Sequence, residues 1–194
     1  LEITNPVSVL EGGGVAAEVV HVDFGSILAI DGGRSIQSTG GGIDAQVCEI
    51  FGDAILRRCS AGFQGGAIFV SVSLIISGSC ALDDSRSGTT GAAILVAEGG
   101  TMELRNTSIS RSSAVTGAAV AVLGSNSTMM QDVHFSQVVG AFFSVVNTGE
   151  EQVVLRDLAL VVNPQFSLPG ASTVVGVTPI VDLKCRCDGV YERG

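Results

Sequence analysis

Short aliphatic runs that begin with glycine recur along the chain at almost constant spacing. Two of them read GGAIFVSV and GAAILVAE, and successive runs start 28, 25, 26, 26 and 23 residues apart. The six runs begin at Gly12, Gly40, Gly65, Gly91, Gly117 and Gly140. Self-similarity with a period of roughly 20 to 50 residues is typical of proteins built from stacked repeats.

A second apolar phrase follows each glycine run, with apolar or small residues spaced as Φ-x-x-Φ-x-Φ. The triplets that fit are Leu56, Cys59 and Ala61; Leu104, Thr107 and Ile109; Met130, Val133 and Phe135; and Leu155, Leu158 and Leu160. Ile76, Cys80 and Leu82 fit after a slip of one residue. Equivalent positions of successive repeats are expected to stack, which would place Cys59 next to Cys80.

The composition of the repeats predicts strands and turns, because they are rich in Gly, Ser, Thr and Val. Helical repeats need roughly 33 to 47 residues to fit two helices. A leucine-rich repeat would show a fixed Leu and Asn frame, and a β-sandwich would lack this glycine register. We therefore expect an all-β fold, a right-handed parallel β-helix (solenoid) of about six coils with little or no helix. In it, Ile68, Ile94 and Val120 should lie one above another.

The pattern also predicts how the chain is divided. Residues 12–160 carry the β-helix repeats, and residues 1–11 are expected to form an N-terminal cap or linker. Residues 161–184 contain three prolines, which remove strand donors, so a C-terminal cap or irregular strands are expected there. Residues 185–194 read as the start of a Cys-rich module. We expect the chain to be a segment of a larger protein.

Composition and charge exclude several classes of partner. Hydrophobic residues make up 46% of the chain and mean hydropathy is +0.50, yet no apolar run reaches the roughly 18 residues of a membrane helix. We therefore expect no membrane insertion. The net charge is −9 and Lys184 is the single lysine, so nucleic acid is not an expected partner. The expected partners are other modules of the same long chain or neighbouring subunits, with glycans as a further candidate.

The glycine phrase at Gly65, Gly66, Ala67 and Ile68 resembles the first motif of the polymorphic outer membrane protein repeats. Degenerate copies start at Gly91 and Gly117, whereas the Asn of the second motif is missing after Phe135. This resemblance implies a β-helix in a surface adhesin, and thus an extracellular or cell-surface location. More broadly, the pattern resembles the pectin-lyase-like superfamily, whose members include polysaccharide-cleaving enzymes.

Candidate catalytic groups are few. Asp83 and Asp84 form the only adjacent acidic pair near the repeat core, and they lie in DDSRSGTT, whose residues are typical of a turn. Glu150–Glu151 also reads as a turn, and His21 and His134 are expected to be plain surface histidines. We expect no catalytic residue, no metal site and no cofactor.

The main hypothesis is a non-catalytic extracellular structural or adhesion module. The alternative is a carbohydrate-active enzyme (polysaccharide lyase, hydrolase or epimerase) or a glycan-binding domain on the same fold.

Five cysteines and two sequons complete the candidate sites. A stacked Cys59–Cys80 pair could form a disulfide or remain two buried thiols, and Cys48 has no evident partner. Cys185 and Cys187 resemble small extracellular disulfide modules, which implies partners outside this chain. Asn126 and Asn106 match the N-glycosylation acceptor. Asn126 is expected in an exposed turn, whereas alternation after Leu104 allows an inward position for Asn106.

Overall fold

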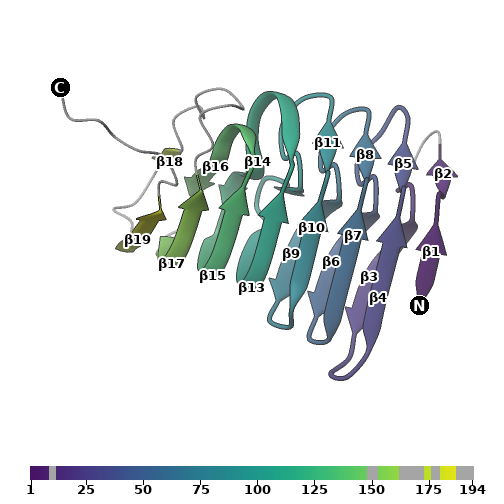
Figure 1. The fold of residues 1–194 in the computed structure, drawn as a ribbon, viewed down its shortest axis with the longest axis horizontal. Helices are drawn as coiled ribbons and strands as arrows, with labels where there is room; N and C mark the ends of the chain where they lie inside the picture. The colour runs from purple at the N-terminus through teal and green to yellow at the C-terminus, as the bar shows by residue number, and fades with distance from the viewer. Residues whose placement is uncertain (9–11, 148–152, 162–172, 176–179, 187–194) are drawn as a thin grey trace.

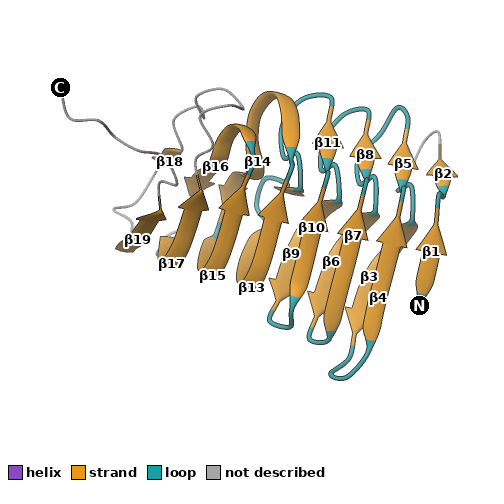
Figure 2. Ribbon diagram, viewed as in Figure 1, coloured by secondary structure: helices purple, strands orange, loops and turns teal. Residues whose placement is uncertain are grey.

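Parallel pairing of every strand winds the chain into a β-solenoid of about six turns in the computed structural model (Figure 1). The structure describes all residues except 9–11, 148–152, 162–172, 176–179 and 187–194. None of the described residues lies in a helix (Figure 2), so none forms a helix that could cross a membrane. The expected all-β solenoid is therefore confirmed.

Each turn runs over three faces. The first face stacks β1 (Glu2–Thr4), β4 (Ile27–Asp31), β7 (Asp53–Arg57) and β10 (Cys80–Asp83), then the last residues of β13 (Thr101–Ser110), β15 (Ser127–Ser136), β17 (Val153–Val161) and β19 (Ile180–Arg186). The second face stacks β2 (Val7–Ser8), β5 (Arg34–Ser35), β8 (Ser60–Ala61) and β11 (Arg86–Ser87), then the first residues of β14 (Ser113–Ser125) and β16 (Val139–Asn147).

The third face is the longest. Its strands β3 (Val15–Val22), β6 (Ile43–Ile50) and β9 (Ile68–Ile76) each span it whole. From the fourth turn it is divided: β12 (Ile94–Val96), the end of β14, β16 and β18 (Thr173–Val175) continue its first half, and the starts of β13, β15 and β17 continue its second half. Successive turns therefore repeat the same path.

Apolar columns run along the interior. Ile68 lies opposite Ile94, and Ile94 lies opposite Val120, as the sequence predicts, and all three are fully buried. A second column, on the first face, consists of Ile30, Leu56, Leu82, Ile109 and Phe135, each no more than 1% exposed. Because each aliphatic side chain covers the one below it, the columns remove apolar surface from water over the whole length.

The repeated glycines turn the chain into the third face. In five of the six phrases the first glycine has a positive φ, of 60° at Gly40, 65° at Gly65, 66° at Gly91, 110° at Gly117 and 105° at Gly140. L side chains rarely adopt this conformation, whereas glycine does so without steric cost. At Gly65 a Cβ atom would also come within 2.6 Å of the Ile68 carbonyl oxygen. The near-constant spacing therefore marks one corner of each turn.

The corner between the first and second faces is turned mainly by residues other than glycine. Asn5, Arg58, Asp84, Arg111 and Gln137 have φ values of 50° to 52°, and Gly32 has 74°. The residue that follows lies inside the corner and is small in four consecutive turns: Gly33, Cys59, Ser85 and Ser112. Backbone bonds join these turns, from Ser60 N to Gly33 O at 2.8 Å and from Arg86 N to Cys59 O at 3.0 Å.

The expected register of Cys59 with Cys80 is wrong. Cys80 lies opposite Ala54, whereas the Cys59 position continues at Ser85, because the next residues, Ser60 and Arg86, are register partners. The triplet equivalent to Ile76, Cys80 and Leu82 is Ile50, Ala54 and Leu56. In both turns the corner before the first face has one more residue than in the turn of Met130 and Val133. The spacing Φ-x-x-Φ-x-Φ therefore also fitted a wrong triplet.

Truncation of a column residue should destabilise the solenoid. We expect Ile94→Ala to lower the free energy of unfolding by about 2 to 5 kcal/mol, because the cavity lies between two fully buried neighbours. Val72→Ala, at a side chain that is 51% exposed on β9, is the control and should change it by less than about 0.5 kcal/mol. Urea denaturation followed by circular dichroism measures both. Equal losses would contradict the column as the source of stability.

Candidate functional site

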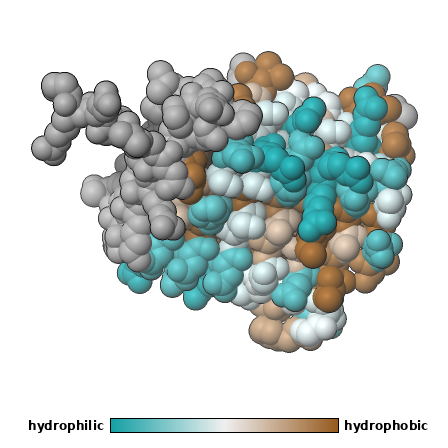
Figure 3. Space-filling model, viewed as in Figure 1, coloured by the Kyte–Doolittle hydropathy of each residue, from teal (hydrophilic) through white to brown (hydrophobic). Residues whose placement is uncertain are grey.

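Charged side chains gather where the first face meets the second. We call this set the charged corner; it consists of Asp31, Arg34, Arg57, Arg58, Asp83, Asp84, Arg86 and Arg111. Figure 3 shows it as a hydrophilic band that crosses the ends of β4, β7 and β10. Five arginines face three aspartates here, although the whole chain has a net charge of −9. Positive charge is therefore concentrated at this corner.

Two ion pairs at the charged corner connect adjacent turns. Arg58 donates from Nε and Nη2 to the two carboxylate oxygens of Asp31, at 2.7 and 2.6 Å. Two turns further, Arg111 donates from Nε to Asp83 Oδ1 at 2.8 Å and from Nη2 to Oδ2, and Ser110 Oγ donates to Oδ1 at 2.7 Å. Such paired geometry fixes the relative position of both partners.

The two aspartates in these pairs are held in their ionised form. The hydrogen bonds from Arg58 lower the pKa of Asp31, and those from Arg111 lower the pKa of Asp83, with a further contribution from Ser110. A general acid that works near neutral pH needs a raised pKa instead. Asp84, the other half of the acidic pair found in the sequence, accepts hydrogen bonds from Arg86 in its own turn at 3.1 and 3.2 Å.

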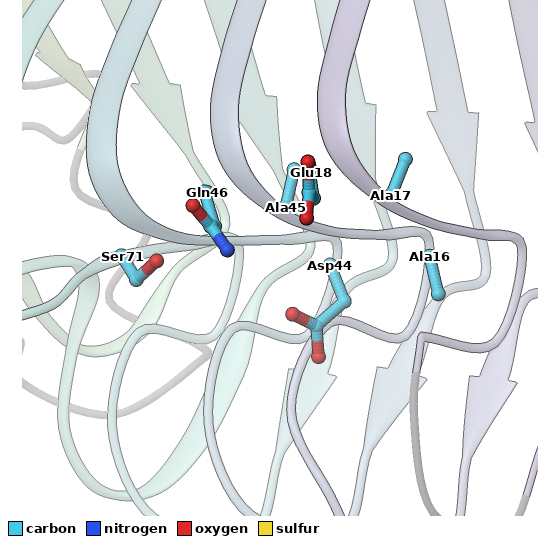
Figure 4. A pocket seen from close by; sticks show the side chains of 7 residues that line it. All are labelled: Ala16, Ala17, Glu18, Asp44, Ala45, Gln46 and Ser71. Carbon is cyan, nitrogen blue, oxygen red and sulfur yellow. The ribbon is translucent and has the colours of Figure 1, made fainter.

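A shallow polar hollow lies on the third face near the start of the solenoid. It is lined by Ala16, Ala17 and Glu18 of β3, Asp44, Ala45 and Gln46 of β6, and Ser71 of β9 (Figure 4). It lies at a register shift between Ala45 and Val47. In Figure 4, Glu18 and Asp44 point apart, and Thr39 Oγ1 donates to Asp44 Oδ2 at 2.6 Å. The carboxylates therefore do not converge on one point.

His21 is more than a plain surface histidine. Its Nδ1 lies 2.9 Å from Glu49 Oε2 on the next turn, and its Nε2 lies 3.0 Å from Asp23 Oδ1. Both hydrogen bonds, with that of Glu49 first, raise the pKa of His21, and only the imidazolium can donate from both nitrogens. The Phe51 ring lies 5.5 Å from the imidazole, and Phe24 lies 5.5 Å from Phe51. His134 is exposed on β15, as expected.

The part of the chain that the structure describes contains no cluster of metal-binding side chains. No group of three or more His, Cys, Asp or Glu side chains is placed there to hold a metal ion. In the His21 cluster the two carboxylates lie on opposite sides of the ring, so they cannot share one ion with a single ring nitrogen. The cluster is instead a link between β3, β6 and the turn that follows β3.

Both sequon asparagines are exposed. Asn126 lies in a turn, as expected, and its Nδ2 donates to Gly99 O at 3.1 Å. Asn106 does not point inward: it takes a φ of 46° between the two halves of β13, and its Nδ2 donates to Ser77 O at 3.3 Å. A left-handed residue interrupts the alternation of a strand, which is why alternation from Leu104 misplaced Asn106.

The three cysteines whose side chains are described are free and buried, so the candidate Cys59–Cys80 disulfide is not present. Desolvation raises the pKa of Cys48 to about 12 and that of Cys59 to about 11, and it raises the pKa of Cys80 as well. They act as small apolar residues of the core. Cys185 lies in β19 opposite Leu160, and Cys187 and Glu150–Glu151 lie outside the described residues.

Comparisons with models of known protein families, with curated proteins and with solved structures found no match. The fold is therefore established by strand register alone.

Neutralising Asp83 should remove a pH-dependent part of the stability. The folded pKa of Asp83 is lowered, so its contribution is complete above the unfolded value of 3.8 and is lost as pH falls through the folded value. We expect Asp83→Asn to lower the free energy of unfolding at neutral pH by about 1 kcal/mol. The difference from the wild type should shrink below about pH 4.

Urea titrations across this pH range measure the effect. Asp53→Asn, at the exposed start of β7, is the control and should show little change at any pH. In the double variant Asp83→Asn/Arg111→Gln the two losses should not add, because each removes the same contact. A loss at Asp83 that stays constant with pH would contradict the ion pair.

Alkylation should distinguish buried thiols from a disulfide. Thiolates react and buried thiols resist ionisation, so iodoacetamide should leave Cys48, Cys59 and Cys80 unmodified in the native protein. After unfolding without a reductant, all three should react completely. Peptide mass spectrometry measures each site. A Cys59–Cys80 linked peptide in the unreduced digest would contradict the structure.

Proposed function

We propose that the chain is a non-catalytic structural or adhesion module, a β-helical segment of a larger cell-surface, matrix or appendage protein. The observation that carries the proposal is the pairing of surface charge between turns. Arg58 with Asp31, and Arg111 with Asp83, each join one turn to the next. These two ion pairs, in which each arginine binds both oxygens of its aspartate, therefore hold neighbouring turns together, and they leave these carboxylates ionised.

The mechanism we propose is mechanical. Each turn contacts its neighbours through strand ladders, core columns and, at the charged corner, ion pairs, so stability is a sum of contacts between adjacent turns. A load along the axis is then shared by many parallel hydrogen bonds. The lateral faces remain free to contact other modules of the same chain or neighbouring subunits.

An extracellular location is part of the proposal. The phrase from Gly65 to Ile68, which resembles the polymorphic outer membrane protein repeat, and the exposed sequons at Asn126 and Asn106 support it. We further propose that Cys185 and Cys187 pair with cysteines outside this chain. The three buried thiols of the core do not bear on that pairing, because their environment is apolar.

The polar hollow favours a second candidate, a glycan-binding domain on the same fold. Glu18, Asp44, Gln46 and Ser71 offer hydrogen-bonding groups on three adjacent turns, which suits the hydroxyl groups of an extended saccharide. Their carboxylates point apart, so the hollow is better suited to binding than to acid–base cleavage (Figure 4). A polysaccharide lyase, hydrolase or epimerase has less support than a binding role.

Single-molecule stretching tests the structural proposal. A chain pulled from its ends should unfold in steps of one turn or a few turns, with about 90 Å of contour length released per turn of roughly 26 residues. Asp83→Asn/Arg111→Gln should lower the unfolding force of the affected turns, and Asp53→Asn should not.

In parallel, uronic-acid polymers are incubated with the protein, and cleavage or epimerisation is measured. Turnover that is lost in Asp44→Asn would overturn the non-catalytic proposal.

A further inference from the structure

A row of hydrogen-bonding side chains runs along the second face, next to the charged corner. We call it the donor row; it consists of Arg34, Ser60, Arg86 and Ser113, one residue from each of four successive turns. Both arginines are exposed, and both serines are half-buried. The strands that carry the row, β5, β8, β11 and β14, are each paired on both sides and lie within the ladder (Figure 1). The row therefore belongs to the body of the solenoid rather than to its ends.

The charged corner has more positive charge than its own aspartates neutralise. Each of its three aspartates accepts hydrogen bonds from one arginine: Asp31 from Arg58, Asp83 from Arg111 and Asp84 from Arg86. The other two arginines, Arg34 and Arg57, are exposed and have no hydrogen-bond partner among the described residues. Their charge is therefore available to an anionic ligand.

Arg86 is the paired arginine that a ligand can recruit most easily. Its Nε and Nη2 donate to a single oxygen of Asp84, at 3.2 and 3.1 Å, whereas Arg58 contacts both oxygens of Asp31 at 2.7 and 2.6 Å. The Arg86 side chain is also 67% exposed. A guanidinium has N–H donors on all three nitrogens, so Nη1 of Arg86 can bind a ligand even while the contact with Asp84 persists.

A hollow beside the donor row brings several donors together. Three successive turns line it, with Asp84 and Arg86 from the first, Arg111 and Ser113 from the second, and Gln137 and Val139 from the third. Guanidinium, hydroxyl and amide groups thus border one space from different directions. This arrangement suits a tetrahedral oxyanion, such as a sulfate ester with three terminal oxygens, better than a planar carboxylate.

The arginines of the donor row recur on every second turn. Neighbouring strands of a sheet are about 4.8 Å apart, so the backbones of Arg34 and Arg86 are roughly 10 Å apart along the solenoid. This separation is close to the length of a disaccharide in an extended polysaccharide. A glycan with one sulfate ester per disaccharide can therefore place successive esters at the two arginines, with Ser60 between them to bind a sugar hydroxyl.

We propose that the charged corner binds a sulfated glycan that lies along the donor row, with sulfate esters at Arg34 and at Arg86. The proposal deepens the adhesion function proposed above, on which it rests, and names its ligand. Guanidinium groups bind such oxyanions through paired, charge-assisted hydrogen bonds. The chain as a whole has a net charge of −9, and the carboxylates of Glu18 and Asp44 in the polar hollow repel an anionic glycan. Binding therefore depends on this corner.

Isothermal titration calorimetry of the full chain with chondroitin sulfate tests the proposal. Unsulfated chondroitin has the same backbone and carboxylates and is the matched ligand control, and poly-glutamate represents an acidic peptide. We expect chondroitin sulfate to bind, and both controls to bind at least about tenfold more weakly. Arg86→Gln should weaken the binding of chondroitin sulfate by about tenfold, because it removes hydrogen bonds to a charged group.

Asp84→Asn tests the same contact with the opposite sign. It releases Arg86 and removes a negative charge from the hollow, so the affinity for chondroitin sulfate should rise severalfold. Asparagine also tolerates the φ of 51° at this position. Arg105→Gln is the matched charge control, because Arg105 lies on β13 in the third face, paired with Glu103 at 2.7 Å, and it should leave the affinity unchanged. Circular dichroism verifies the fold of each variant.

Three kinds of result would contradict the proposal. The first is a wild type that does not bind chondroitin sulfate, or binds unsulfated chondroitin or poly-glutamate equally well. The second is an equal loss in Arg86→Gln and Arg105→Gln, or a fall in affinity in Asp84→Asn. The third is tighter binding of a phosphorylated mannan, which would assign the row to phosphate esters instead. A chain that unfolds stepwise under load but binds no glycan would overturn this inference alone and leave the structural function standing.

Discussion

The structure depends on one constraint, that equivalent positions of successive turns lie directly above one another. Each interior position must then hold a side chain that packs on the side chain at the same position in the next turn. This explains columns of similar aliphatic residues, such as Ile68, Ile94 and Val120. A strand shifted by one residue would turn its apolar side outward, because side chains alternate between faces. Register is therefore enforced by the whole core rather than by single contacts.

The corners turn the chain from one face to the next while keeping equivalent positions aligned. From the second turn on, glycine provides the positive φ at the start of the third face, where a side chain would also collide with the backbone. At the charged corner the left-handed residues are Arg58, Asp84 and Arg111, which accept some backbone strain. Two of them use their side chains to bind a carboxylate of the preceding turn, so one residue both bends the chain and fastens it.

The period of the glycine runs was enough to predict the fold and the stacking of Ile68, Ile94 and Val120, because both follow from spacing alone. Spacing could not identify Ala54 rather than Cys59 as the partner of Cys80, since corner lengths differ by one residue between turns. The polar hollow was missed because its register shift has no marker in the sequence. His21 and Glu49 are 28 residues apart, which is also the distance in sequence between the first two glycine runs. Their contact could therefore have been predicted from the repeat spacing.

The corner before the first face differs in length between turns, and this has a consequence for how such a solenoid can change its length. Three residues separate Ile50 from Ala54, and two separate Met130 from Val133, yet the strands on either side keep their alignment. Small insertions are thus absorbed where the chain bends, whereas those within a strand would reverse its inner and outer sides. Evolution can lengthen this protein by duplicating whole turns, and can decorate it by enlarging bends, without redesigning the interior.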